Sequence, residues 1–238
     1  MPLTSSNPTN IAKNLTQIQQ NISQYSQKYH RNPQEVHLLA VSKTKPAEDI
    51  RAAFNAGQSR FGENYLQESI NKIHDLADLQ IEWHFIGAIQ SNKTREIAEN
   101  FAWVHSVDRI KIAHRLSQQR PESLPPLNIC LQINISHENS KSGFNINDTE
   151  SAVNEIIKLP NLKLRGLMAI PAKAENLSEQ RAIFSQMKRL LAKLQSQHAQ
   201  LDTLSMGMSG DMEAAIAEGS TLLRIGTAIF GERNISGL

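Results

Sequence analysis

The stretch HLLAVSKTKPAEDIRAAFNAG, residues 37–57, contains one strand, one loop and one helix in succession. Its opening HLLAVS is an apolar run typical of a buried strand, and Lys43 ends that run. Pro46 opens a helix-period segment that Gly57 closes, which is the usual asymmetry of a helix start and stop. Alternation of this kind demands parallel strands, because each helix carries the chain back across the sheet.

The same two-part pattern recurs along the whole sequence. Strand candidates lie at 37–42, 59–62, 83–87, 103–107, 128–134, 164–170, 202–207 and 222–226. Helix-period segments lie between them at 63–79, 91–100, 108–119, 147–159, 177–198 and 210–218. About eight such units favour a closed barrel over an open doubly wound sheet. We therefore predict an α/β protein with a single (β/α)8 TIM barrel domain over residues 1–238, since no linker-like tract divides the chain.

An extra helix is predicted before the first strand, over residues 8–29. Apolar residues recur there at alternating spacings of four and three, which places them on one helix face. The segment spans too few heptads to form a coiled-coil dimer alone, so we expect it to pack on the barrel's own core and the protein to be a monomer. The apolar positions are Ile11, Leu15, Ile18, Ile22, Tyr25 and Tyr29.

The composition of the 238-residue chain excludes several classes of protein. Its formal net charge is only +2, and the basic residues form no concentrated stripe, so we expect no nucleic-acid partner. The N-terminus lacks the features of a secretory signal and no run is long enough to span a membrane, which predicts a cytoplasmic protein. A single cysteine, Cys130, allows neither an intrachain disulfide nor a thiolate metal cluster, and we expect it to be buried.

Ligands of such barrels bind at the carboxyl ends of the strands, which makes Lys43 the first candidate. A lysine at the barrel mouth is partly desolvated, and desolvation lowers the pKa of an ammonium and exposes a nucleophilic lone pair. Such an amine can form an imine with an aldehyde. Lys45 shares the strand parity of Lys43, so spacing does not choose between them, and an ordinary loop lysine is the alternative interpretation.

The loops after the seventh and eighth strands are the usual phosphate site of a barrel. Gly207 and Gly210 allow the backbone to approach an anion, and Ser209 offers a hydroxyl. Gly226 and Thr227 place two further amides at the same corner.

Arg224 interrupts the apolar eighth strand, and a buried guanidinium needs a partner. A carboxylate such as Asp211 or Glu213 could pair with it, and a ring nitrogen of a ligand is the alternative. An imine-forming lysine, a phosphate site and a cation that faces a heteroaromatic nitrogen are together the features that hold pyridoxal 5'-phosphate (PLP).

Several ordered blocks of the sequence resemble the pyridoxal phosphate homeostasis proteins, the YggS/PROSC family, which are similar to the barrel domain of bacterial alanine racemase. These blocks are LLAVSKTKP, FGENYLQE, EWHFIG, QSNK, QINIS, ENSKSG, LRGLMAIP, MEAAI and RIGTAIFG. The resemblance implies that PLP is held as an imine on Lys43 rather than on Lys45. It further implies a cofactor site of Lys43, Asn64, His84, Met208, Ser209, Arg224, Gly226 and Thr227, in which Gly226 and Thr227 take the phosphate and Arg224 faces the pyridine nitrogen. Where the family usually has an aspartate this chain has Gly210, which we expect to loosen the following helix start.

The resemblance favours a protein that stores PLP and delivers it, possible recipients being apo PLP-dependent enzymes. Racemisation needs a second proton-transfer group, which in the racemases is a tyrosine of a separate domain, and none of Tyr25, Tyr29 and Tyr65 is clearly placed for that role. Arg224 also opposes protonation of the ring nitrogen, which makes the cofactor a poorer electron sink. We therefore expect no catalytic residues; a PLP-dependent amino-acid racemase of narrow range is the alternative, and a lysine-imine aldolase acting on a phosphosugar is a third.

The segment HENSKSG, residues 137–143, follows the fifth strand on the expected ligand side. Its Lys141 is predicted to modulate cofactor release, a hypothesis that rests on position and charge. A solvated loop lysine is the alternative interpretation.

Overall fold

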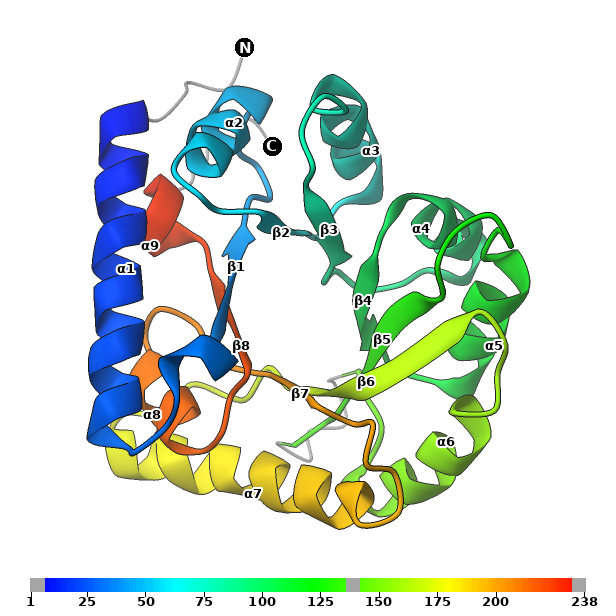
Figure 1. Cartoon of the computed structure of the whole chain (residues 1–238). Coiled ribbons are helices and arrows are strands. Elements are labelled where there is room, and N and C mark those ends of the chain that lie inside the picture. The colour runs from blue at the N-terminus through cyan, green and yellow to red at the C-terminus, as the bar shows by residue number, and fades with distance from the viewer. Residues whose placement is uncertain (1–6, 136–141, 233–238) are drawn as a thin grey trace.

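Eight parallel strands close into a barrel in the order β1 to β8, with β8 paired to β1 (Figure 1). The computed structural model describes residues 7–135 and 142–232. The predicted α/β TIM-barrel class is confirmed. The strands are β1 (His37–Val41), β2 (Arg60–Glu63), β3 (Glu82–Phe85), β4 (Trp103–Val107), β5 (Leu127–Gln132), β6 (Leu162–Met168), β7 (Thr203–Ser205) and β8 (Leu222–Ile225).

Helices surround the barrel, and each predicted helical segment contains one. They are α1 (Pro8–Lys28), α2 (Ala47–Asn55), α3 (Leu66–Asp75), α4 (Thr94–Asn100), α5 (Ile110–Gln119), α6 (Thr149–Ile156), α7 (Leu177–Gln195), α8 (Met212–Ala217) and α9 (Thr227–Phe230). Short 3-10 turns η1 (Pro33–Glu35), η2 (Ser91–Lys93) and η3 (Ile146–Asp148) precede β1, α4 and α6. Both η1 and α9 are absent from the sequence prediction, because segments this short show no periodicity.

The N-terminal helix α1 covers the seam where the barrel closes. Asn7 caps it by accepting a hydrogen bond from the amide of Thr9, and Pro8 occupies its first turn. The isoleucines and the leucine of its apolar stripe are buried and the two tyrosines are partly buried, and the helix lies against α2, α8 and α9, as Figure 1 shows. The prediction that this stripe packs on the barrel's own core is confirmed.

Two separate sets of side chains are buried in the described parts of the chain. The large hydrophobic core lies between the outer faces of the strands and the helices. Smaller clusters fill the barrel interior, because alternate residues of each strand point inward. Cys130 belongs to one of these clusters, and its complete burial raises the pKa of its thiol to about 12, as expected of a structural cysteine.

Among the helices within residues 7–135 and 142–232, none is long and apolar enough to cross a membrane. The same residues form no group of three or more metal-ligating side chains.

Candidate functional site

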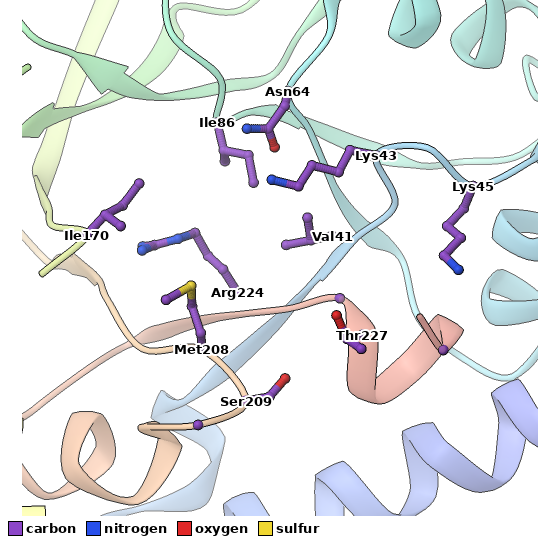
Figure 2. A pocket seen from close by; sticks show the side chains of 13 residues that line it. Val41, Lys43, Lys45, Asn64, Ile86, Ile170, Met208, Ser209, Arg224 and Thr227 are labelled. Atoms are coloured by element: carbon purple, nitrogen blue, oxygen red, sulfur yellow. The ribbon is translucent and has the colours of Figure 1, made fainter. Parts of the chain in front are cut away.

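A pocket of about 310 Å³ opens at the carboxyl ends of the strands (Figure 2). Its walls come from the carboxyl ends of β1, β2, β3, β6, β7 and β8 and the loops that follow them, segments that are far apart in the sequence. The structure brings all the predicted cofactor residues to this pocket except His84. The lining residues are Val41, Lys43, Lys45, Asn64, Ile86, Ile170, Met208, Ser209, Gly210, Arg224, Gly226, Thr227 and Gly231.

Lys43 lies in the turn that follows β1, on the same side of the chain as Val41. Its half-buried side chain extends into the pocket, with the amine between Asn64 and Val41 (Figure 2). The next residue, Thr44, has a φ of 64°, a left-handed conformation that is costly for a β-branched residue. The turn that carries Lys43 thus contains a strained residue directly after it.

Lys45 takes a different direction from Lys43, although the two have the same strand parity. Its Nζ donates hydrogen bonds to the carbonyl oxygens of Phe230, at 2.9 Å, and Glu232, at 2.8 Å. Figure 2 shows its side chain running away from the amine of Lys43. Lys45 therefore holds the end of α9, while Lys43 presents its amine to the pocket.

A buried polar cluster supports the turn that carries Lys43. The Nζ of Lys72 donates to the carbonyl oxygen of Ser42, at 2.8 Å, and to the carboxylate of Glu63, at 2.9 Å. Glu63 also accepts the hydroxyl proton of Ser42. Glu68 accepts from Lys72 and from the amide of Thr44, so the cluster fixes the residues on both sides of Lys43.

The loop between β7 and α8 approaches the pocket from the side opposite Lys43. Gly207 begins it with a φ of 97°, and a Cβ at this position would lie 2.4 Å from the Cβ of Ala215. The carboxylate of Asp211 accepts the amide proton of Met208 and closes the loop one residue before α8 begins. Burial raises the pKa of Asp211. Gly210 has open space around its Cα, so the loop does not depend on a glycine there.

The hydroxyls of Ser209 and Thr227 face a common space at the far end of the pocket from Lys43 (Figure 2). Gly226 lies beside them at the start of α9 and is packed against Val41 of β1. This corner offers hydroxyl groups and exposed backbone to an anion.

Arg224 is a buried charged residue of the mouth, 5% exposed on β8. Its Nη1 donates to the carbonyl and hydroxyl oxygens of Ser205, at 2.6 and 2.8 Å, and its Nη2 donates to the carbonyl oxygen of Ala169, at 2.9 Å. Among the described residues neither predicted carboxylate forms an ion pair with Arg224. Glu213 binds Lys28 of α1 and Tyr29 just after that helix, while Asp211 acts on Arg224 through its charge. Burial lowers the pKa of Arg224 to about 10, which leaves it a cation at neutral pH.

His84 does not reach the mouth, and the prediction for it is corrected here. It lies in the middle of β3, fully buried, two residues before Ile86, which does line the pocket. Its ring stacks on Trp103 at 5.4 Å between centroids and lines a second cavity at the amino ends of the strands. His84 points into the barrel like Ile86, but it lies one layer deeper than the mouth at which the resemblance placed it.

Comparison with known proteins agrees with this geometry. The family model for the N-terminal domain of alanine racemase matches residues 14–234. A pyridoxal phosphate homeostasis protein from Pseudomonas aeruginosa is 59% identical over 204 residues, 86% of this chain and 87% of that protein. Its counterpart from Escherichia coli K12 is 52% identical over 230 residues, 95% and 98% of the two chains. The chain belongs to the pyridoxal phosphate homeostasis protein family.

Solved structures extend the comparison to three dimensions. PipY of Synechococcus elongatus PCC7942, solved with PLP bound, is 38% identical and aligns with a TM-score of 0.80 over 93% of this chain and all of that one. PipY without PLP aligns with a TM-score of 0.83. Alanine racemase of Clostridium difficile 630 has the same barrel, with a TM-score of 0.73 at 14% identity, but this chain covers only 58% of that enzyme. Members of the homeostasis family therefore match this chain over nearly their full length.

Proposed function

We propose that this protein binds PLP in the mouth pocket as an imine on Lys43, stores it, and delivers it to apo PLP-dependent enzymes. The observation that carries the proposal is the separation of two chemistries in one pocket, with the Lys43 amine at one end and the Ser209 and Thr227 hydroxyls at the other. A ligand that carries an aldehyde and a phosphate needs an amine at one end of its pocket and anion-binding groups at the other. The PLP-bound relative PipY, at 38% identity, supports the same ligand.

The residues present fit a ligand of this kind. The Oδ1 atom of Asn64 is buried and has no hydrogen-bond partner within the described parts of the chain, and Asn64 lines the pocket beside Lys43. A buried acceptor without a partner is costly, so a bound donor at this point would be stabilising. Arg224 forms three hydrogen bonds to protein atoms, whereas a guanidinium carries five N–H donors.

We assign the predicted residues at the mouth to different parts of the ligand. Lys43 supplies the amine, and Gly226, Thr227 and Ser209 bind the phosphate. Arg224 directs a remaining N–H toward the ring nitrogen. Met208 and Asn64 contact the ring of the ligand and its substituents.

We propose that the protein has no catalytic turnover of its own. Tyr25, Tyr29 and Tyr65 are not among the residues that line the pocket, so none is placed to serve the ligand face opposite Lys43. The positive charge of Arg224 also opposes protonation of a ring nitrogen beside it. Steady amino-acid racemisation by the purified protein, lost in Lys43→Ala, would contradict this proposal.

Borohydride reduction tests the binding proposal directly. The protein loaded with PLP should show a visible imine absorption that reduction removes, and mass mapping should find the adduct on Lys43. Lys43→Ala should give no adduct, whereas Lys45→Ala should still carry it on Lys43. An adduct on Lys45, or none on either lysine, would overturn the assignment.

We further propose that the protein acts in the cytoplasm as a single-domain monomer. Delivery to apo enzymes is testable by mixing the loaded protein with an apo PLP-dependent enzyme and following recovery of its activity. Lys141, predicted to modulate release, lies outside the described residues.

A further inference from the structure

A continuous line of hydrogen bonds crosses the barrel interior from Arg224 to Glu82. The Nη1 of Arg224 is 2.8 Å from the hydroxyl of Ser205, which is 2.8 Å from Nδ1 of His105. The Nε2 of His105 is 2.8 Å from Nδ1 of His84, and the Nε2 of His84 is 2.9 Å from the carboxylate of Glu82. We call these five residues the interior network.

The carboxylate end and the neutral rings together give the interior network a single direction. An ionised carboxylate can only accept, so Nε2 of His84 carries a proton, and a neutral His84 then accepts at Nδ1 from the Nε2–H of His105. Ser205 accepts from Arg224 and donates to His105. With both rings neutral, His105 and His84 each carry their proton on Nε2. Burial lowers the pKa of each imidazole, in agreement with the neutral forms.

This arrangement is unusual for the inside of a barrel. Branched apolar side chains normally fill that space, since a buried polar group is costly unless it is fully hydrogen-bonded. Here His84, His105 and Ser205 are 0% exposed, and each ring nitrogen and the hydroxyl has a partner. A satisfied network of this kind holds each member in one orientation.

The interior network joins the two ends of the barrel. Arg224 lines the mouth pocket, while Glu82 and His84 line a cavity of about 580 Å³ at the amino ends of the strands. Glu82 is itself held by the Nε of Arg60, at 3.1 Å. The interior network thus connects the guanidinium that faces the proposed ligand to residues at the opposite end of the barrel.

We propose that Ser205, His105, His84 and Glu82 are positioning residues for Arg224, which fix its guanidinium so that its remaining N–H donors are directed at the ring nitrogen of the ligand. This role rests on the proposed function. Without the Ser205 hydroxyl, Arg224 keeps two of these three hydrogen bonds, to the carbonyl oxygens of Ser205 and Ala169, and its guanidinium is held less firmly. The electronic state of a bound imine would then change, even though Lys43 is untouched.

The tautomers provide a test that needs no ligand. The ¹⁵N NMR spectrum of the ligand-free protein, assigned with His84→Gln and His105→Gln, should show both rings as neutral Nε2–H tautomers near neutral pH. A proton on Nδ1 of either ring, or an imidazolium, would overturn the interior network as described. His74, which is largely exposed, serves as the reference for a solvated ring.

Ser205→Ala tests the positioning role in the loaded protein. Because one hydrogen bond to a charged group is lost, we expect the dissociation constant for PLP to rise about fivefold and the ratio of the imine absorption bands to change. Borohydride should still trap the adduct on Lys43. Ser205→Thr, which keeps the hydroxyl, should restore both properties.

Ser106→Ala is the matched control, because Ser106 is equally buried and adjoins His105 on β4, but its hydroxyl donates to the carbonyl of Gly87. It should leave affinity and spectrum unchanged. If Ser205→Ala behaves like Ser106→Ala, the positioning role is refuted while the binding proposal stands. If the wild-type protein traps no PLP at all, the proposed function fails, and the NMR result is unaffected.

Discussion

The ammonium of Lys72 lies 2.9 Å from the carboxylate of Glu63, in a part of the barrel wall that is closed to solvent. Their side chains are 7% and 0% exposed. The same ammonium binds the carbonyl oxygen of Ser42, the residue before Lys43. A buried ion pair is weak support for stability in general, but breaking one by removing a single partner is strongly destabilising. The pair therefore links the integrity of the fold to the position of the reactive amine.

Lys72→Met should lower the free energy of unfolding by about 3 kcal/mol, because it leaves the carboxylate of Glu63 buried without its cation. Denaturant unfolding of the two proteins measures the difference. The double variant Glu63→Gln/Lys72→Met should recover part of the loss, since no charge is then stranded. A double variant less stable than Lys72→Met would contradict the pairing.

Thr44→Gly should stabilise the protein by about 1 kcal/mol, because a glycine adopts the left-handed φ without strain. The substitution also removes the Thr44 hydroxyl, whose oxygen is buried without a hydrogen-bond partner among the described residues. The affinity for PLP should fall about threefold, since the looser turn must be ordered on binding. Unfolding curves and spectroscopic titration measure the two effects.

Asn161→Gly is the control for this pair of effects, because Asn161 also has a left-handed φ, of 61°, but is not among the residues of the mouth pocket. It should leave the affinity for PLP unchanged. Equal loss of affinity in both variants would show that the turn after β1 has no special role.

The two glycines of the β7–α8 loop should respond in opposite ways to alanine. Gly210→Ala should raise the unfolding free energy by about 0.5 kcal/mol, because its Cβ meets open space and the unfolded chain loses freedom. Gly207→Ala should lower it by more than about 2 kcal/mol, because the φ is left-handed and the Cβ would collide with Ala215. Thermal or denaturant unfolding distinguishes them, and similar behaviour of the two variants would contradict the loop geometry.

Stability should decline as the pH falls below the ordinary histidine pKa of 6.5. Burial lowers the folded-state pKa of His84 and His105, so the unfolded chain binds more protons between that value and the folded pKa. Each histidine contributes a slope of up to about 1.4 kcal/mol per pH unit in this window, and none of it above pH 6.5. Glu82, whose pKa is lowered chiefly by its hydrogen bond to His84, adds a similar decline only below its ordinary value of 4.5.

His105→Gln should therefore show a shallower decline than the wild-type protein when unfolding is measured between about pH 7 and pH 5. The groups that face His105 are His84 and Arg224, and both remain in the variant. If the unfolding free energy of His105→Gln changes with pH as steeply as that of the wild-type protein, His105 is not responsible for the decline.

Much of the fold could be predicted from the sequence because parallel barrel strands are buried on both faces and appear as short apolar runs. The four-residue helix α9 could not, since it is shorter than the pattern that reveals a helix. His84 illustrates another limit. Periodicity tells which face of a strand a residue occupies, but not how deep in the barrel it lies.

In the site, too, the sequence pattern shows local spacing but does not show contacts between residues that are far apart in the chain. Lys43 and Lys45 are equivalent in spacing, and what separates them is the contact of Lys45 with Phe230, a residue 185 positions away. The link from Arg224 through Ser205 to His105 was also beyond prediction, because buried serines and histidines in strands carry no distinguishing pattern. Their roles emerge only when strands β4, β7 and β8 are placed side by side.

Besides α2, the helix α1 contacts two helices at the other end of the chain, α8 and α9. Lys28 pairs with Glu213, and Asn14 donates to the carbonyl oxygen of Ile229, on α8 and α9. During synthesis on a ribosome α1 emerges before the barrel strands, and α2 can cover part of its apolar stripe early. The remaining cover, from α8 and α9, exists only after those helices have been made, so burial of the stripe is completed together with closure of the barrel.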